Sequence, residues 1–187
     1  IDYQAGSRAL LTQADSGFAV QQVLTQKLQL YVLEDFLSAP ECDQLMAVAS
    51  AQLRPSTVTT KDADKLFRTS ETSDLGLLKN PFVAQVDEKI NAALGIHPAH
   101  AEGTQAQRYA VGQEFKRHTD YFQPGTAELK AYGGVRGNRT WTFMVYLNEV
   151  ASGGGTHFFA LNKTIHPKKG MALAWNNLYP DGTVNPD

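Results

Sequence analysis

The stretch RTWTFMVYLNEV, residues 139–150, has the composition of a β-strand with two buried faces. Thr142, Met144 and Tyr146 occupy alternate positions, and large apolar residues fill the positions between them. Successive side chains of a strand point to opposite faces of a sheet. We therefore predict that one face of this strand lines the interior of a barrel or sandwich, while the other packs against an outer layer.

Other strand-like segments surround this one from residue 104 onward, and two helices are expected before them. The first helix is predicted over about 39–52, because SAPE (38–41) matches a capping box. The second is predicted over 80–95, with Asn80 as its N-cap and Gly95 as its end. Helices followed by strands indicate an α+β fold with an antiparallel sheet folded on itself. The expected strands lie within 28–36, 104–120, 139–150, 153–160 and 164–177.

Composition limits the classes of partner and compartment. The chain has 187 residues, enough for one domain, and a net charge of −2, which gives no support to a nucleic-acid partner. No apolar run is long enough to span a bilayer, so no membrane partner is expected. Cys42 is the single cysteine, so no intramolecular disulfide can form and a reducing, cytoplasmic compartment is favoured. The oligomeric state is left open.

His118 and Asp120 are the candidate metal ligands. They stand two residues apart in FKRHTDYF (115–122), so on a strand both side chains would share one face. They would supply two of the three ligands of the facial triad that holds Fe(II), although zinc enzymes use similar ligands. The alternative is a histidine and an aspartate that are merely neighbours, since such a pair is expected by chance roughly half the time in a chain of this composition.

Four segments together resemble one family. The run RYAVGQEFKRHTDYF (108–122) resembles the Y-x-x-G-x-x-[YF]-x-x-H-x-D-x-F strand of the prolyl 4-hydroxylase family of Fe(II)- and 2-oxoglutarate-dependent dioxygenases. Residues 139–159 are similar to its R-x-x-T-x-x-x-Y-L-N segment and G-G-x-T-x-F hairpin. Residues 165–186 resemble its P-x-x-G-x-A-L-x-[FW] strand and P-D-G loop, and residues 33–45 its opening strand and helix.

The resemblance implies a fold and an activity. The fold would be a double-stranded β-helix (jelly roll) with N-terminal helices packed on one sheet, in a single catalytic domain over residues 1–187 with residues 1–27 as an arm. The activity would be hydroxylation of a peptidyl proline, coupled to decarboxylation of 2-oxoglutarate to succinate. Fe(II), 2-oxoglutarate, O2 and ascorbate are the implied cofactors and co-substrates, and a proline-containing peptide or protein is the implied partner. Alternatives are the same chemistry on another side chain or a small molecule, and a non-catalytic jelly-roll binding module.

The resemblance also implies roles for individual residues. Tyr109 matches the tyrosine that hydrogen-bonds the co-substrate, and Thr156 matches a hydroxyl facing the 2-oxoglutarate pocket. Tyr146 is a second candidate for the distal carboxylate of 2-oxoglutarate. Arg139 is the candidate catalytic residue, placed near the peptide substrate. Without the family, these four would be read as core tyrosines, a strand threonine and an exposed arginine.

The chain departs from the family pattern at its end. The family has a second histidine ligand after the P-D-G loop, followed by a lysine or arginine for 2-oxoglutarate, whereas this sequence ends at PDGTVNPD (180–187). We expect that the C-terminal strand is missing from the chain, because a jelly roll without it would leave an unpaired sheet edge. The alternative is a protein that binds iron and co-substrate weakly. Phe115, where many relatives carry tyrosine, is a second departure.

Overall fold

The computed structural model describes residues 5–12, 17–57, 66–134 and 136–187. Its largest sheet is antiparallel, with the strand order β1-β2-β9-β6. The four strands are β1 (Ala19–Val23), β2 (Leu30–Glu34), β9 (Ala172–Asn176) and β6 (Trp141–Val145). Residues 19–23, which the sequence placed in an N-terminal arm, therefore form an edge strand of this sheet.

Two smaller antiparallel sheets complete the β-structure. One has the order β3-β4-β5, and the other is the hairpin of β7 and β8. Their strands are β3 (Arg54–Pro55), β4 (Glu71–Ser73), β5 (Ala106–Arg108), β7 (Thr156–Phe158) and β8 (Lys163–Ile165). The predicted α+β class with antiparallel sheets is confirmed.

Three α-helices and four shorter helical segments make up the helical part of the described chain. The α-helices are α1 (Ala5–Leu11), α2 (Ala39–Ser50) and α3 (Pro81–Leu94). The shorter segments are η1 (Leu75–Leu77), η2 (Pro98–His100), η3 (Leu129–Gly133) and η4 (Phe159–Leu161). Among the described residues, none of these helices has the length and apolar character needed to cross a bilayer.

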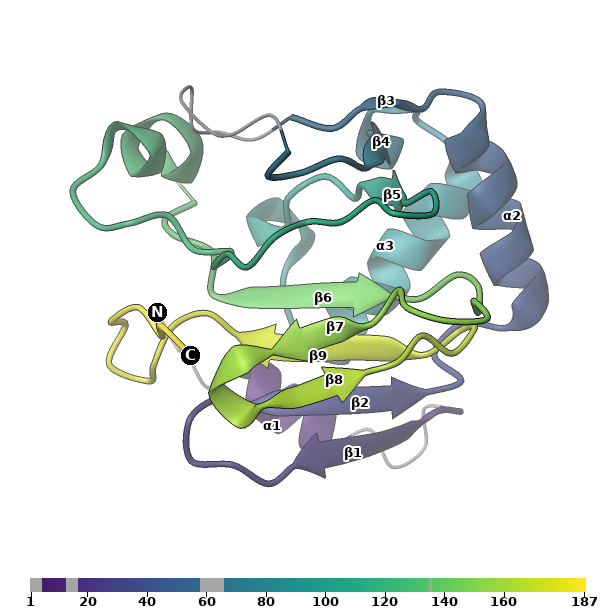
Figure 1. Cartoon of the computed structure of the whole chain (residues 1–187). Helices are drawn as coiled ribbons and strands as arrows, with labels where there is room; N and C mark the ends of the chain where they lie inside the picture. The colour runs from purple at the N-terminus through teal and green to yellow at the C-terminus, as the bar shows by residue number, and fades with distance from the viewer. Residues whose placement is uncertain (1–4, 13–16, 58–65, 135) are drawn as a thin grey trace.

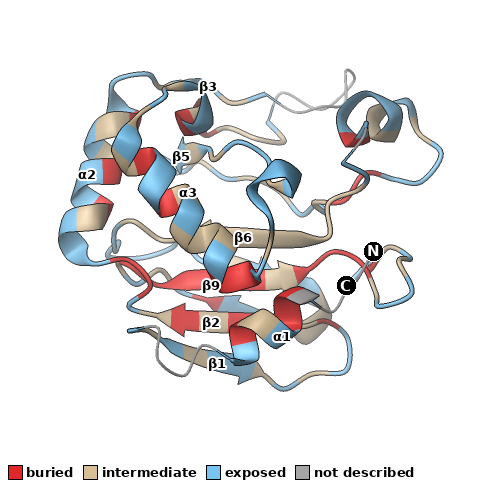
Figure 2. Ribbon diagram, turned by 180° about the vertical axis from the view of Figure 1, so that it is seen from behind, coloured by how far each residue is buried: buried red, intermediate tan, exposed pale blue. Residues whose placement is uncertain are grey.

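The large sheet separates two apolar clusters. The helices cover one face, where Leu33 and Ala174 of the sheet meet Leu45 of α2 and Val86 of α3 (Figures 1 and 2). The β7–β8 hairpin covers the opposite face, where Leu173 contributes to a second cluster (Figure 1). The alternation in the 139–150 stretch follows this division. Phe143, Val145 and Leu147 join the helical side, whereas Met144 and Tyr146 join the hairpin side.

Local signals placed both long helices correctly. The Ser38 hydroxyl accepts from the Glu41 backbone amide, and the Glu41 carboxylate accepts from the Ser38 amide, as a capping box requires. Asn80 caps α3 through its side-chain oxygen. Gly95 ends α3 at a φ of 61°, a left-handed conformation that glycine adopts without the strain of a side chain.

The prediction of one strand through residues 104–120 is wrong beyond residue 108. After β5 the chain turns at Ala110–Gln113, where Gly112 has a φ of 81°. Residues 114–116 then run beside residues 67–69, joined by the backbone bonds Thr69 N–H to Glu114 O and Lys116 N–H to Phe67 O. His118 and Asp120 follow in an irregular segment. A turn that requires a left-handed residue interrupts the strand, although the flanking residues have β-like composition.

Candidate metal and co-substrate site

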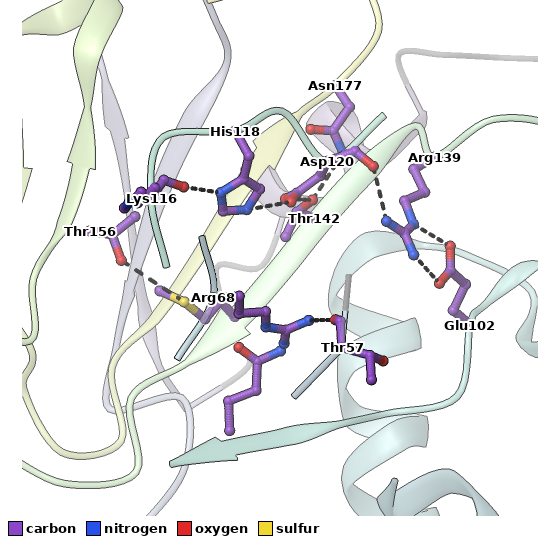
Figure 3. Close-up of polar contacts among 12 residues, drawn as sticks. Thr57, Arg68, Glu102, Lys116, His118, Asp120, Arg139, Thr142, Thr156 and Asn177 are labelled. Carbon is purple, nitrogen blue, oxygen red and sulfur yellow. Dashed lines mark hydrogen bonds and ion pairs between the residues drawn. The ribbon is translucent and has the colours of Figure 1, made fainter. Parts of the chain in front are cut away.

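The candidate site lies along β6 on the side that faces the β7–β8 hairpin. Pairing with β9 fixes the register of β6, so that Thr142, Met144 and Tyr146 share this face. The irregular segment 115–120 reaches the Thr142 end of the strand, and Thr156 of β7 reaches the Tyr146 end. Figure 3 shows the Thr142 end with the side chains that meet there.

His118 and Asp120 come together although they are not on a strand. The Nε2 atom of His118 lies 3.3 Å from Oδ1 of Asp120 (Figure 3), and 31% of the His118 side chain and 23% of the Asp120 side chain remain accessible to solvent. The Nδ1 atom of His118 is 2.7 Å from the backbone oxygen of Lys116. A carbonyl oxygen only accepts hydrogen bonds, so Nδ1 carries a proton there.

This arrangement has two chemical readings. In the neutral imidazole, Nε2 is unprotonated and its lone pair faces a carboxylate oxygen, so that two acceptors need a cation between them. In the protonated imidazole, Nε2 donates to Asp120 and the two residues form an ion pair. A nitrogen and a carboxylate oxygen are a donor set that suits divalent iron and zinc. The residues present therefore fit two positions of a metal site.

A complete ligand set is not found among these residues. Within the parts of the chain that the structure describes, no three side chains of histidine, cysteine, aspartate or glutamate lie close enough to hold one ion. His157 bonds instead to the Thr164 hydroxyl on the exposed side of the hairpin, with its Nδ1 at 2.8 Å from Oγ1.

Asp120 is held as an anion. Its Oδ2 atom accepts a 2.6 Å hydrogen bond from the Thr142 hydroxyl. Burial by itself would raise the pKa of Asp120, but hydrogen bonds from His118 and Thr142, together with the charge of Arg139, hold that pKa below its ordinary value. An ionised carboxylate is the form that binds a metal ion.

The ring of Phe115 orients the imidazole. It stacks on His118 with ring centroids 3.6 Å apart and an angle of 18° between the planes. The guanidinium of Arg68 also lies over the Phe115 ring, 4.7 Å from its centroid. The phenylalanine that departs from the family pattern is thus a packing surface for a candidate ligand.

Tyr146 and Thr156 meet at the other end of β6. The two hydroxyl oxygens are 2.6 Å apart, and the tyrosine hydroxyl also donates to the backbone oxygen of Ile165 at 3.2 Å. Burial raises the pKa of Tyr146, although its bonds to Thr156 oppose the shift, so the phenol stays neutral and remains a donor. The structure brings these two residues together, and their role in binding co-substrate stays a prediction.

The other two predicted residues lie at the edges of the site. Tyr109 follows β5, is 43% exposed, and donates from its hydroxyl to the side-chain oxygen of Gln107 at 3.1 Å. Arg139 binds both carboxylate oxygens of Glu102 at 2.6 and 2.9 Å, and its Nη1 donates to the backbone oxygen of Asp120 at 3.1 Å (Figure 3). Arg139 therefore fixes the backbone of a candidate ligand. The predicted roles of both residues toward substrates remain predictions.

Sequence reasoning missed Arg68. Its Nη1 donates to the backbone oxygen of Thr57, while Nε and Nη2 are shielded from solvent without a hydrogen-bond partner (Figure 3). Burial lowers the pKa of this guanidinium, and the nearby Tyr109 hydroxyl and Asp120 carboxylate oppose the shift only in part. Arg68 lies in a segment (54–78) rich in threonine, serine and aspartate, which holds no signal that this arginine turns inward.

Comparisons with known proteins identify similar sequences. Residues 104–183 match the profile of the 2OG-Fe(II) oxygenase superfamily. Prolyl 4-hydroxylase subunit alpha-1 of Gallus gallus is 30% identical over 152 residues, which are 79% of this chain and 29% of that protein. The probable prolyl 4-hydroxylase 4 of Arabidopsis thaliana is 30% identical over 192 residues, which are 89% of this chain and 62% of that protein. The chain thus spans less than two thirds of these relatives.

One solved structure shares the fold. The viral collagen prolyl hydroxylase of Paramecium Bursaria Chlorella virus-1, solved as a 2OG complex, superposes with a TM-score of 0.62 at 24% sequence identity. The match covers 84% of this chain and 82% of the viral chain. The resemblance to the prolyl 4-hydroxylase family that the sequence motifs indicated is confirmed by the profile match and the two curated relatives.

Proposed function

We propose that this chain, which matches the 2OG-Fe(II) oxygenase superfamily over residues 104–183, is a dioxygenase that hydroxylates a peptidyl proline. In this reaction one oxygen atom of O2 enters the proline as a hydroxyl group, and the other enters succinate as 2-oxoglutarate loses CO2. The observation that carries the proposal is the approach of His118 Nε2 to Asp120 Oδ1 within 3.3 Å, with Nδ1 of the imidazole already bonded to a carbonyl. A pair prepared in this way suits a divalent cation.

The arrangement of the sheets supports a double-stranded β-helix. The large sheet and the β7–β8 hairpin face each other across an apolar layer that includes Leu173 and Ile165. The helices cover the outer face of the large sheet. This agrees with the expected jelly roll in which N-terminal helices pack on one sheet. We take residues 1–187 as a single catalytic domain. The single cysteine further supports the cytoplasm as the compartment.

Each end of β6 has a proposed task. His118 and Asp120 would hold Fe(II), which together with 2-oxoglutarate and O2 supplies the oxidising chemistry when bound. Tyr146 and Thr156 would bind a carboxylate of 2-oxoglutarate, because their hydroxyls lie on the same face of the sheet as the metal ligands. The hydroxyl of Tyr109 would hydrogen-bond the same co-substrate. Ascorbate is proposed as the reductant that keeps the iron ferrous.

The connection after the ligands supports a peptide as substrate. Tyr132 of η3 is 60% exposed and stacks on Phe122, with ring centroids 5.8 Å apart. The guanidinium of Arg139 lies 4.5 Å from the centroid of the same Phe122 ring. Phe122 is buried, so Tyr132 is the exposed aromatic ring of this group. Proline-rich segments bind to exposed aromatic side chains, because their extended helix is already formed. We therefore place the peptide beside Arg139, where the side chain that reacts can reach the metal.

Turnover assays test this proposal. The protein is incubated with Fe(II), ascorbate, 2-oxoglutarate and a proline-rich peptide, and both succinate and hydroxyproline are measured. Asp120→Ala is expected to abolish both products, whereas Asp43→Ala, an exposed carboxylate paired with Lys169, should leave them unchanged. Production of succinate without hydroxyproline would indicate that the substrate is another side chain or a small molecule. Equal turnover by wild type and Asp120→Ala would exclude the iron assignment.

A further inference from the structure

A threonine and an asparagine form a series of hydrogen bonds that ends at the candidate ligand Asp120. Thr142 of β6 donates to Oδ2 of Asp120 at 2.6 Å, and the side-chain nitrogen of Asn177 is 2.9 Å from the Thr142 oxygen (Figure 3). Asn177 is the first residue after β9, the strand that pairs with β6. Three segments distant in sequence thus contribute to one chain of hydrogen bonds.

The chemistry of the three groups fixes the direction of each bond. The carboxylate of an aspartate is ordinarily ionised near neutral pH, and an ionised carboxylate only accepts hydrogen bonds. The Thr142 hydroxyl has one proton, which must therefore point to Asp120. Toward Asn177 the same hydroxyl can only accept, so the amide NH2 group of Asn177 must be the donor. The hydrogen bonds therefore run in one direction only, from Asn177 to Thr142 and from Thr142 to Asp120.

The backbone around Asn177 holds this orientation in place. Asn177 is 4% exposed. Its N–H donates to the Thr140 carbonyl at 2.8 Å, and its own carbonyl accepts from the Asn185 N–H at 2.9 Å. With the backbone held on both sides, a flip of the side-chain amide would set Oδ1 of Asn177 against the Thr142 oxygen, two acceptors with no proton between them.

We propose that Thr142 and Asn177 are positioning residues that reserve a single oxygen of Asp120 for the metal ion. Oδ2 is occupied by the Thr142 proton, and Oδ1 is the oxygen that faces His118 Nε2. A carboxylate that coordinates through one oxygen leaves the remaining positions of a facial triad open for co-substrate and oxygen. Coordination through both oxygens would fill one of those positions. The inference rests on the proposed function, since it presupposes the metal site.

The positioning matters here because the ligand segment is irregular. Asp120 lies outside any strand, so a sheet does not dictate its side-chain direction. The hydrogen bond from Thr142 connects it to β6, whose position is fixed by five paired residues of β9. Outer partners of this kind typically change metal affinity or activity about 10- to 100-fold when removed.

Metal titration of the protein tests the inference without any need for turnover. Co(II) is used as the probe, and both its dissociation constant and its visible absorption spectrum are measured. Thr142→Val, which keeps the shape and removes the hydroxyl, should weaken binding about 10- to 100-fold and alter the spectrum, because Asp120 is released to rotate. Thr142→Ser should restore the wild-type affinity and spectrum. Thr164→Val, which removes a hydroxyl bonded to His157 at the exposed side of the hairpin, is the matched control and should change neither.

Asn177→Asp provides a second variant of almost equal volume. It replaces the donor with an acceptor that competes for the Thr142 proton, so it should weaken Co(II) binding even where Thr142→Val folds poorly. Wild-type affinity and spectrum in both folded variants would overturn the inference and leave the proposed metal site intact. A wild-type protein that does not bind Co(II) would overturn the metal site and the inference together.

Discussion

The Tyr146–Thr156 end of the site lies between strands, whereas the His118–Asp120 end lies in a segment without regular structure. At the first end, backbone hydrogen bonds of β6 to β9 and of β7 to β8 set where the hydroxyls point. At the second end, a few individual hydrogen bonds set the positions of the ligands. Lys116 binds the imidazole through its carbonyl, and Thr142 and Arg139 bind the carboxylate and the backbone of Asp120.

The two ends should therefore respond differently to mutation. A strand position is supported by many bonds and by packing on both faces, so a change there acts mainly on the stability of the fold. A ligand in an irregular segment depends on a few specific contacts, so a change there acts mainly on metal binding and activity. This separation gives four predictions, from the largest effect to the smallest.

The largest effect is expected for His118→Gln. The variant removes a candidate ligand, so Co(II) affinity should fall by more than about 100-fold, beyond the loss typical of an outer partner. The free energy of unfolding without metal should change little, because the imidazole contributes to no apolar cluster. Isothermal titration with Co(II) and urea unfolding measure the two quantities. A large loss of stability in the metal-free variant would contradict the separation of the two ends.

Leu173→Ala tests whether a change in a strand acts mainly on the stability of the fold. Leu173 is fully buried between β9 and the hairpin, so its truncation should lower the free energy of unfolding by about 2–5 kcal/mol. Leu24→Ala is the control, since Leu24 is 91% exposed and its truncation should have almost no effect. Below the unfolding temperature, the affinity of the Leu173→Ala variant for Co(II) should remain near that of the wild type. A specific loss of metal affinity in this variant would show that the sheet sets the ligand geometry.

The sequence predicted the strands around the Tyr146–Thr156 end better than the segment that holds His118 and Asp120, and the reason is physical. Alternation in residues 139–150 and the caps at Ser38, Asn80 and Gly95 are local signals, and the structure confirms each of them. The spacing of His118 and Asp120 identified the pair but placed it on a strand, because composition does not reveal the turn at Gly112. That the two side chains still meet follows from long-range contacts to Thr142, which local patterns do not encode.

Other members of the candidate site had no local signal at all. Arg68 stands in a polar segment, and only its stacking on Phe115 and its two unpartnered donors distinguish it from a surface arginine. Asn177 is polar, yet it is buried, because it directly follows β9 and its side chain hydrogen-bonds to Thr142. Burial of polar residues is decided by tertiary pairing, so a single sequence does not disclose it.

A smaller effect is expected for Phe115→Leu. The substitution keeps an apolar side chain but removes the ring that stacks on His118 and supports Arg68. Aromatic pairs contribute about 0.5–1.5 kcal/mol beyond their buried area, so Co(II) affinity should fall about 2- to 10-fold. Phe115→Tyr, which restores the residue common in the family, should keep the wild-type affinity. An unchanged affinity in Phe115→Leu would mean that the carbonyl of Lys116 alone orients the imidazole.

The smallest effect concerns the dependence of stability on pH in the metal-free protein. The pKa of Asp120 is lower in the folded protein than its ordinary value of 3.8, because hydrogen bonds from His118 and Thr142 outweigh the opposing effect of burial. The folded state therefore favours the ionised carboxylate relative to the unfolded chain. This contribution to stability is fully present above pH 3.8 and is lost as the pH falls through the folded pKa.

Urea unfolding of the wild type and of Asp120→Asn, followed from about pH 5 to about pH 3, measures this contribution, because an ordinary histidine beside the carboxylate changes its charge only above this range. The asparagine does not titrate, and Arg68 and Arg139 stay charged throughout the range. The difference in unfolding free energy between the two proteins should hence change little from about pH 5 to pH 3.8 and should shrink in favour of the variant below pH 3.8. A difference that grows with acidification would mean that Asp120 is protonated more readily in the folded state, and the hydrogen bond from Thr142 would then not hold an anion.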